Sequence, residues 1–379
     1  MSEHPSRHNF PAFLAFAAFP SARATLGLAA GLCLLAGSAA AQSTVTIYGR
    51  INTALEHVSA SRSPVSLTQT RLTSNRSVVG FSGAEDLGGG LKTIWQIEGG
   101  FALDTGTGSL FNRDTRVGLA GDFGTLFVGV WALPYTAATA GFDPFYPTTA
   151  GYMAIMGNGS APTTDNVIDT SSFDRRQRNQ IQYWSPKLGG FSARLAYGFN
   201  EERVGAARPS LLSMAGTYED GPLQLTAAHE IHHEYQAAST SDKAYKLGAA
   251  YQFGPARLAA VVERLHYETA TGVLNRNAWY VSAIYQLCVG SLRAGYSRAG
   301  DGHGSAKEKV GFFSSGANTG SSQLTVGYEY PLSKRTAVYS YYSSIRNKSA
   351  ARYDFAINEL GIAPGARPSA FALGLRHNF

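Results

Sequence analysis

The C-terminal segment Ser369–Phe379 constrains the fold most, because its side chains alternate between two chemical types. One parity holds Phe371, Leu373, Leu375 and Phe379, and the other holds Ala370, Ala372, Gly374, Arg376 and Asn378. A β-strand directs alternate side chains to opposite faces, so this segment predicts a ribbon with one apolar face and one small or polar face. A second sheet or lipid must cover the apolar face.

Residues 1–41 are predicted to be a secretory signal peptide. The segment carries two arginines, an apolar core at 25–37, and small residues that end at Ala41. A membrane-anchoring helix is the alternative, but the core is shorter than the roughly 20 apolar residues that cross a bilayer. The mature chain is therefore expected to be residues 42–379, and the true translation start stays open.

Charge and cysteine content exclude several classes of protein. Removal of the first 41 residues takes away two arginines and one glutamate, so the formal net charge falls from +6 to +5. This charge is too diffuse to indicate nucleic-acid binding. Cys33 leaves with the signal, so Cys288 has no disulfide partner in the mature chain, and we interpret it as a packed turn residue.

Alternating segments recur along the mature chain. No run of about 18 apolar residues follows residue 41, so no transmembrane helix is expected. Segments of period two are separated by Gly, Pro, Asn and Asp, as in β proteins. Sixteen candidate strands share this pattern and lie near residues 44–57, 70–83, 89–102, 111–121, 123–131, 176–186, 189–200, 208–219, 222–235, 242–253, 255–268, 276–287, 289–299, 319–331, 334–347 and 368–379.

The connections between these strands alternate strictly between short and long. Tight connections such as Asp122–Phe123 and Asp220–Gly221 are followed by longer polar stretches. Outer-membrane barrels carry short turns on one rim and long loops on the other, whereas a soluble sandwich has no such requirement. An even strand number lets the last strand pair with the first, which removes a sheet edge that lipid cannot satisfy. We therefore predict an all-β membrane protein, a closed antiparallel 16-stranded transmembrane β-barrel.

Charged residues fall on the parity that would line the lumen. A charge that faces lipid at the midplane costs about 2–4 kcal/mol, and a dry core could not hold this many charges. A wet interior in a barrel of this size predicts a channel. The predicted inward residues are Arg50, Arg76, Lys92, Glu98, Arg176, Arg178, Arg194, Glu230, Lys246, Arg293 and Glu329, together with Ser74 and Val78 of the second strand.

The stretch 132–175 is the longest connection. A structureless loop of this length is usually functional, and folding it into the bore would narrow the pore. That arrangement is predicted to place Asp143, Asp165 and Asp169 opposite the arginine-bearing wall, where opposed charges focus the field on a passing solute. The alternative is an external loop.

Six segments carry a resemblance to a known family, and they are Val45–Gly49, Val79–Lys92, Val117–Gly124, Tyr183–Pro186, Leu332–Thr336 and Gly374–Phe379. They resemble the trimeric general porins of the Gram-negative outer membrane. The resemblance implies a homotrimer of sixteen-stranded barrels in outer-membrane lipid, with the third external loop folded inward. It also implies that the terminal Phe379 is the signal read by the outer-membrane assembly machinery.

The resemblance further implies which side chains form the pore constriction, and on this chain they correspond to Arg76, Arg113, Arg176 and Glu98. The first family position is occupied here by Val78, and Arg76, two residues earlier on the same face, is the candidate substitute. For the second position, strand parity places Arg113 outward and Arg116 inward. A bulge would reverse this, and the sequence leaves the choice open.

His229–His233 matches the zinc-protease pattern H-E-x-x-H, which places both histidines on one face of a helix. Here the flanking residues alternate as in a strand, which would separate the two histidines by about 13 Å. Zinc–nitrogen bonds measure only about 2.0–2.1 Å. We therefore expect no metal site, no cofactor and no enzymatic activity.

These observations predict a pore for passive diffusion of small hydrophilic solutes and ions, with a weak preference for anions because the wall holds more arginine and lysine than glutamate. Two alternatives stay open: a substrate-specific uptake channel, and a plugged barrel that binds a partner at the cell surface. Electrical conductance would separate a pore from a plugged barrel.

Overall fold

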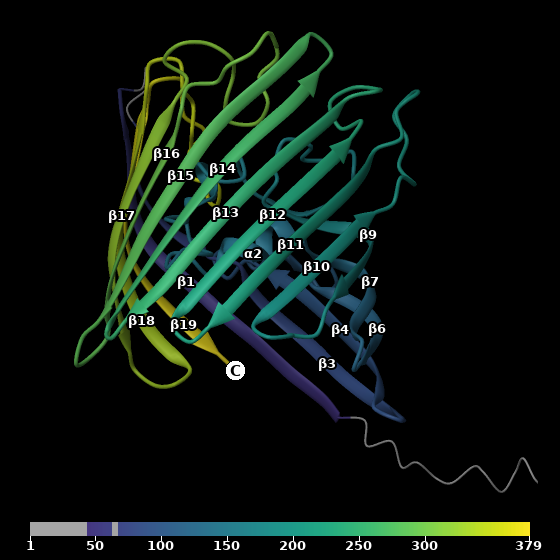
Figure 1. Ribbon diagram of the computed structural model, residues 1–379. Helices are drawn as coiled ribbons and strands as arrows, with labels where there is room; N and C mark the ends of the chain where they lie inside the picture. Colours follow the sequence, from purple (N-terminus) through teal and green to yellow (C-terminus); the bar gives the residue numbers. More distant parts are fainter. Residues whose placement is uncertain (1–43, 63–66) are drawn as a thin grey trace, which may run out of the picture. The chain divides into compact units, whose positions relative to one another are not determined.

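The computed structural model describes residues 44–62 and 67–379. The chain divides into Met1–Ala41 and Gln42–Phe379, and every described residue belongs to the second unit. The predicted signal peptide lies outside the described residues. In the second unit the strands form one sheet that closes on itself (Figure 1).

Sixteen long strands build the wall of the barrel within the described residues. β2 and β3 are two halves of one wall strand, and β5 and β8 are short pieces in the connections. The strands are β1 (Thr44–Ser61), β2 (Leu67–Ser74), β3 (Ser77–Gly88), β4 (Leu91–Phe101), β5 (Gly108–Ser109), β6 (Thr115–Gly121), β7 (Gly124–Ala132), β8 (Ala161–Thr164), β9 (Arg175–Trp184), β10 (Phe191–Gly198), β11 (Ser210–Asp220), β12 (Leu223–His233), β13 (Ser241–Phe253), β14 (Ala256–Thr269), β15 (Gly272–Gln286), β16 (Ser291–Ala299), β17 (Ser321–Pro331), β18 (Thr336–Asn347) and β19 (Arg367–Asn378). The predicted closed, antiparallel, 16-stranded barrel is confirmed.

The first and last strands close the barrel. β1 pairs antiparallel with β19 from Arg50↔Asn378 to Ser61↔Arg367. Beyond β19, the backbones of Gly49 and Phe379 exchange two hydrogen bonds of 3.0 Å each. A Cβ atom on Gly49 would lie 2.3 Å from the Phe379 ring, so glycine at this position leaves room for the terminal ring beside β1.

Short turns gather on one rim and long connections on the other, with one exception. β14 ends at Thr269 and β15 begins at Gly272, so the predicted loop at 269–275 is a tight hairpin that extends the wall (Figure 1). Gly272, with φ of 153°, permits the turn, and buried Leu274 continues the strand beyond it. The expectation of strict alternation is wrong at this point.

Side-chain exposure follows the predicted alternation. In β19, Phe371 and Leu373 are each 55% exposed on the outer face, whereas Ala370 and Ala372 are 0% exposed. The outer wall is therefore apolar, as a lipid-facing surface requires. Within residues 44–62 and 67–379, no helix is long and apolar enough to span a membrane.

The second wall strand changes parity where β2 meets β3. Ser74 pairs with outward-facing Thr53, whereas Val78 pairs with inward-facing Arg50. Arg76, with a left-handed φ of 55°, lies in the break and interrupts the period of two. The predicted inward position of Ser74 is therefore wrong, and that of Val78 is right.

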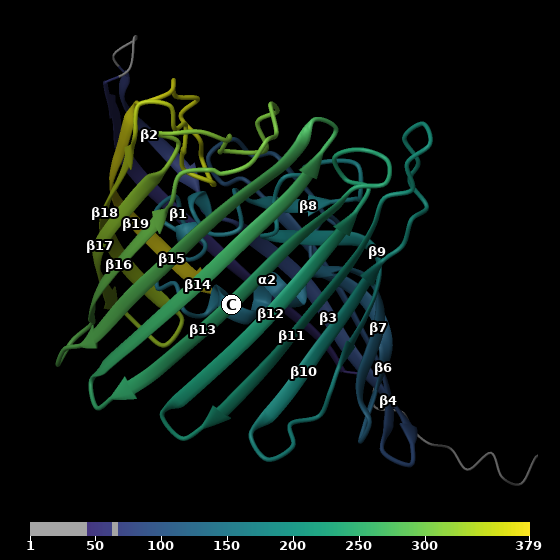
Figure 2. The ribbon, with the colours of Figure 1, turned by 45° about the horizontal axis from the view of Figure 1, so that its top comes forward.

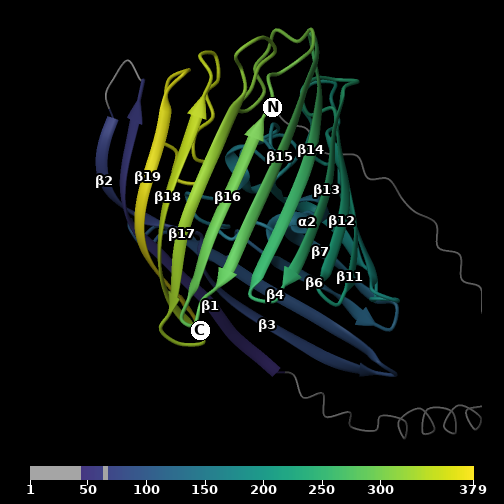
Figure 3. The same ribbon diagram turned by 60° about the vertical axis from the view of Figure 1, so that its left-hand side comes forward.

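The segment between β7 and β9, here called loop 3, lies inside the barrel. It contains α2 (Pro134–Ala140) and the 3₁₀ turn η1 (Tyr152–Ala154), followed by β8. Figures 2 and 3 show α2 within the ring of strands. Most of its buried aromatic side chains pack in one cluster with inward-facing alanines such as Ala228, Ala244 and Ala278, and Phe145 packs in a second cluster. These small wall residues leave room for the loop, and the predicted inward fold of loop 3 is confirmed.

Candidate pore constriction

Arg76 joins the barrel wall to loop 3. Its guanidinium donates a hydrogen bond to the Tyr146 hydroxyl at 2.9 Å and a second one to Ser160 Oγ. Arg50 Nη2 donates to the backbone carbonyl of Arg76 at 3.0 Å. The left-handed backbone at Arg76 thus directs the Arg76 side chain toward loop 3. It directs the Arg76 carbonyl group toward the guanidinium of Arg50.

Arg113 and Glu98 form the next contact along the wall. Arg113 Nε lies 3.0 Å from Glu98 Oε1, and the Tyr48 hydroxyl donates to Glu98 Oε2 at 3.1 Å. Arg113 precedes β6, so strand parity does not govern it, and its backbone N–H donates to the Glu98 carbonyl at 3.1 Å. Arg116, within β6, also faces inward opposite Gln96. Both candidates therefore point into the lumen.

Arg176 forms the third contact with loop 3. Its Nε lies 2.6 Å from Asp114 Oδ1, and its Nη1 donates to the Pro162 carbonyl at 2.8 Å. Its side chain is only 7% exposed. The sequence reading missed Asp114, although its place directly after Arg113 was an available signal.

Together these groups make a constriction cluster with an excess of positive charge, consisting of Arg50, Arg76, Arg113 and Arg176 with Glu98 and Asp114. Four guanidinium groups face two carboxylates, so two positive charges are uncompensated. In a narrow site with low-dielectric walls such an excess concentrates anions.

Loop 3 is held in place by a separate set of inward charges. Glu263 on β14 accepts hydrogen bonds from the Tyr135 hydroxyl at 2.9 Å and from the Gly157 N–H at 2.9 and 3.0 Å. The same carboxylate pairs with Arg276 at 2.8 Å and lies 3.9 Å from Lys246. One buried carboxylate therefore ties two points of the loop to three wall strands.

The three predicted loop carboxylates do not face the constriction arginines. Asp143 accepts hydrogen bonds from the N–H groups of Phe145 and Tyr152 and from the Tyr280 hydroxyl, at 2.9–3.0 Å. Burial raises the pKa of Asp143 to about 6, against the lowering effect of these donors. Asp165 caps the backbone of the following residues, and Asp169 is exposed. The sequence-based placement of these carboxylates opposite the arginine wall does not match this geometry.

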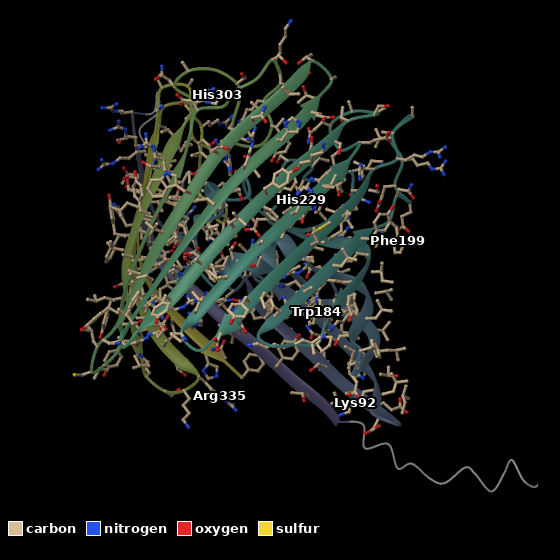
Figure 4. The ribbon with its side chains drawn as sticks, in the orientation of Figure 1. Lys92, Trp184, Phe199, His229, His303 and Arg335 are labelled. Atoms are coloured by element: carbon tan, nitrogen blue, oxygen red, sulfur yellow. The ribbon has the colours of Figure 1, made fainter. Side chains whose placement is uncertain are left out.

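Two predicted wall cations also lie apart from the cluster. Lys92 lies at the short-turn end of β4, close to the lower rim in Figure 4. Arg178 lies where β9 carries one extra residue relative to β7, because Gly129 pairs with Gln180 and Trp131 pairs with Gln177. This bulge breaks the parity that was expected to align Arg178 with Arg176, and the Arg178 side chain is exposed.

The histidine motif lies on a strand, as predicted. His229 and His233 belong to β12 and share its outward parity, whereas Glu230 and His232 face inward and hydrogen bond at 2.8 Å. His229 stacks on Tyr245 with ring centroids 4.3 Å apart. In the part of the chain that the structure describes, no three His, Cys, Asp or Glu side chains are grouped to hold a metal ion.

Three comparisons with known proteins agree with this architecture. The pattern of the family described as Gram-negative porin matches residues 27–350. Outer membrane porin protein 32 of Delftia acidovorans is 28% identical over 367 residues, which cover 93% of this chain and 99% of the relative. An anion-selective porin from Comamonas acidovorans superposes with a TM-score of 0.73 and 25% identity over 89% of this chain and 100% of that chain. OmpT of Vibrio cholerae in its trimer form, at 16% identity and a TM-score of 0.64 over 89% and 99% of the two chains, supports the fold alone.

Proposed function

Because this chain belongs to the Gram-negative porin family, and is therefore an outer-membrane pore rather than an enzyme, we propose that it admits small hydrophilic solutes by passive diffusion with a modest preference for anions. The preference is supported by the constriction cluster, in which four guanidinium groups outnumber two carboxylates. The similarity to a porin described as anion-selective points the same way.

Selectivity in this proposal comes from charge and width together. Loop 3 contributes Tyr146, Ser160 and the Pro162 carbonyl to the contacts with the arginine wall. A solute must pass close to uncompensated guanidinium groups, which attract anions and repel cations. No chemical step is required, so transport follows the concentration gradient.

Reversal potentials across planar bilayers test the proposal. The purified protein is inserted between two KCl solutions of different concentration, and the zero-current potential gives the ratio of chloride to potassium permeability. A ratio above one is expected. A ratio below one would overturn the anion preference, and the absence of any conductance would favour the plugged-barrel alternative. Saturable block by one solute at low concentration would favour substrate-specific uptake.

We further propose a homotrimer, a cleaved signal peptide at residues 1–41 and an assembly role for Phe379. Membership of the porin family supports the first of these. The apolar C-terminal strand, whose last ring is 41% exposed on the outer face, supports the last. Mass measurement of the detergent-solubilised protein tests the trimer and the cleavage site together. Deletion of Phe379 is expected to lower the assembled fraction.

A further inference from the structure

A second group of cationic side chains lies in the lumen on the short-turn side of the constriction. Arg116 on β6 lies opposite inward-facing Gln96, and Arg194 on β10 lies opposite inward-facing Trp184. β6 continues from Arg116 to Gly121, where a short turn follows. Trp184, labelled in Figure 4, ends β9 directly before another short turn. The short-turn rim is the periplasmic rim in outer-membrane barrels.

Three aromatic rings hold Arg116. Its guanidinium carbon lies 4.1 Å from the centroid of Trp131, 4.8 Å from that of Phe127 and 4.9 Å from that of Trp184. The rings contact one another edge to face, with centroids 5.1–5.7 Å apart. A guanidinium stacks favourably on aromatic faces, and here the rings bury Arg116 Nε and Nη1 while the charge stays in the lumen wall.

The local sequence makes room for this arrangement. Gly129 lies opposite Arg116 in the ladder, and a Cβ atom there would come within 2.2 Å of the Thr115 carbonyl oxygen. Trp184 Nε1 donates to Gln182 Oε1 at 2.5 Å, and Gln182 Nε2 donates to the Ala132 carbonyl at 3.3 Å. The wall therefore fixes the Trp184 ring before any solute arrives.

Arg116 and Arg194 differ from most other lumen arginines because they have no acidic partner. Arginines that pair with carboxylates in the lumen include Arg71, Arg113, Arg176, Arg276, Arg293 and Arg376. Among the described residues, neither Arg116 nor Arg194 forms an ion pair, and Arg116 Nε and Nη1 have no hydrogen-bond partner. Arg194 is exposed and lies 4.7 Å from the centroid of the same Trp184 ring.

Two positive charges therefore stack on one ring, and neither forms an ion pair with another described residue. We propose that Arg116 and Arg194, stacked on Trp184, form a second anion-binding site in the lumen, which takes small carboxylates that carry an aromatic ring. The carboxylate accepts hydrogen bonds from the exposed guanidinium edge of Arg194, the charge of Arg116 adds to the attraction, and the aromatic ring of the solute stacks on the open face of Arg194. This inference rests on the proposed function, because the solute must reach the site through an open pore.

Single-channel recording tests the site with benzoate as the probe and cyclohexanecarboxylate as its non-aromatic counterpart of equal charge. Each is added on the periplasmic side in KCl, and the concentration that halves the chloride current is measured. Benzoate is expected to block at the lower concentration. Arg194→Gln should raise the half-blocking concentration of benzoate about tenfold, which corresponds to the loss of one charge-assisted hydrogen bond. Arg335→Gln, which removes an exposed cation from a turn on the same rim, is the matched control and should change neither value.

The outcomes separate this inference from the proposed function. Equal block by the two carboxylates, or unchanged benzoate block in both Arg194→Gln and Arg116→Gln, would overturn the second site while the pore stands. Loss of all KCl conductance in the unmodified protein would overturn the pore itself. Arg194 is exposed, so Arg194→Gln is expected to assemble. Benzoate block can therefore still be measured in this variant if Arg116→Gln fails to assemble. Arg194→Lys keeps the charge without the planar stack and should lose the preference for benzoate.

Discussion

Two sets of inward charges in this barrel have opposite roles. The constriction cluster places Arg50, Arg76, Arg113 and Arg176 where loop 3 meets one side of the wall. The anchor set, made of Lys246, Glu263 and Arg276, lies under the same loop on the other side. The constriction cluster has two uncompensated positive charges, whereas the anchor set is fully buried around one carboxylate.

The difference shows that facing direction alone does not separate a structural charge from one that meets solutes, because the anchor charges also face inward but are buried against loop 3. Glu263 is 4% exposed, and its carboxylate oxygens accept hydrogen bonds from loop 3 and lie close to two cations of the wall. Removing one partner from such a set leaves an uncompensated buried charge, which lowers the free energy of unfolding. A partly exposed throat arginine can lose its charge at little cost to stability, and selectivity changes instead.

The largest effect is therefore expected in the anchor set. Glu263→Ala would leave Arg276 and Lys246 unpaired and free Tyr135 and Gly157 of loop 3, at a cost of about 3–5 kcal/mol in the free energy of unfolding. Denaturant unfolding in detergent measures it. Glu219→Gln is the matched control, because its pair with Lys187 is about half exposed on both sides and is worth at most about 1 kcal/mol. A similar loss in both variants would contradict the comparison.

Loop 3 should also respond to pH through Asp143. Its pKa is raised from 3.8 to about 6 by burial, so the folded protein binds this proton more tightly than the unfolded chain does. The resulting stabilisation is fully present below pH 3.8 and is lost as pH rises through about 6, by about 3 kcal/mol in total. Unfolding measured at several pH values in the unmodified protein and in Asp143→Asn tests this. The variant should be less sensitive to pH over that window, and identical profiles would show that Asp143 is not the group responsible.

Regular strands let the sequence predict which residues face the lumen. Lys246 and Glu329 lie on uninterrupted ladders, and Glu98 lies far along its ladder from the register shift between Asp86 and Gly88, so the period of two places all three correctly. The same rule failed at Ser74, because Arg76 interrupts the strand with a left-handed backbone. It also failed to align Arg178 with Arg176, because one residue is inserted in β9. The pattern of apolar and polar residues does not reveal where one residue is inserted into a strand.

The contacts of the loop residues in the site could not be predicted from the sequence for a different reason. Asp143 and Asp114 carry the same charge, and only tertiary packing decides that the first is buried against Tyr280 while the second pairs with Arg176. The position of Arg113 was open for the same reason, since it lies just outside β6. The sequence therefore predicted the barrel and the arginine-bearing wall, but not the partners of each charge.

In the constriction cluster, Arg76→Gln should change selectivity and leave stability nearly intact. Arg76 contacts Tyr146 and Ser160 and has no acidic partner among the described residues, so its charge is uncompensated. A unit charge about 4 Å from an ion in water is worth about 1 kcal/mol, so chloride permeability should fall roughly fivefold, and the chloride-to-potassium permeability ratio should fall further because potassium is no longer repelled. Reversal potentials measure the ratio. Arg76→Lys keeps the charge and should keep most of the selectivity, and a fall of equal size in that variant would indicate a change in pore shape.

The smallest effect is expected at Arg178. Its side chain is exposed at the bulge in β9, two residues from Arg176, which is 7% exposed and paired with Asp114. Exposed charges are screened within about 8–10 Å at physiological salt, so Arg178→Gln should change the permeability ratio less than twofold, well below the effect of Arg76→Gln. The two variants are compared at 0.1 M and at 1 M KCl. An equally strong shift in Arg178→Gln and Arg76→Gln at both concentrations would mean that the bulge directs Arg178 into the throat. On β9, exposure would then not distinguish Arg178 from the charges of the constriction cluster.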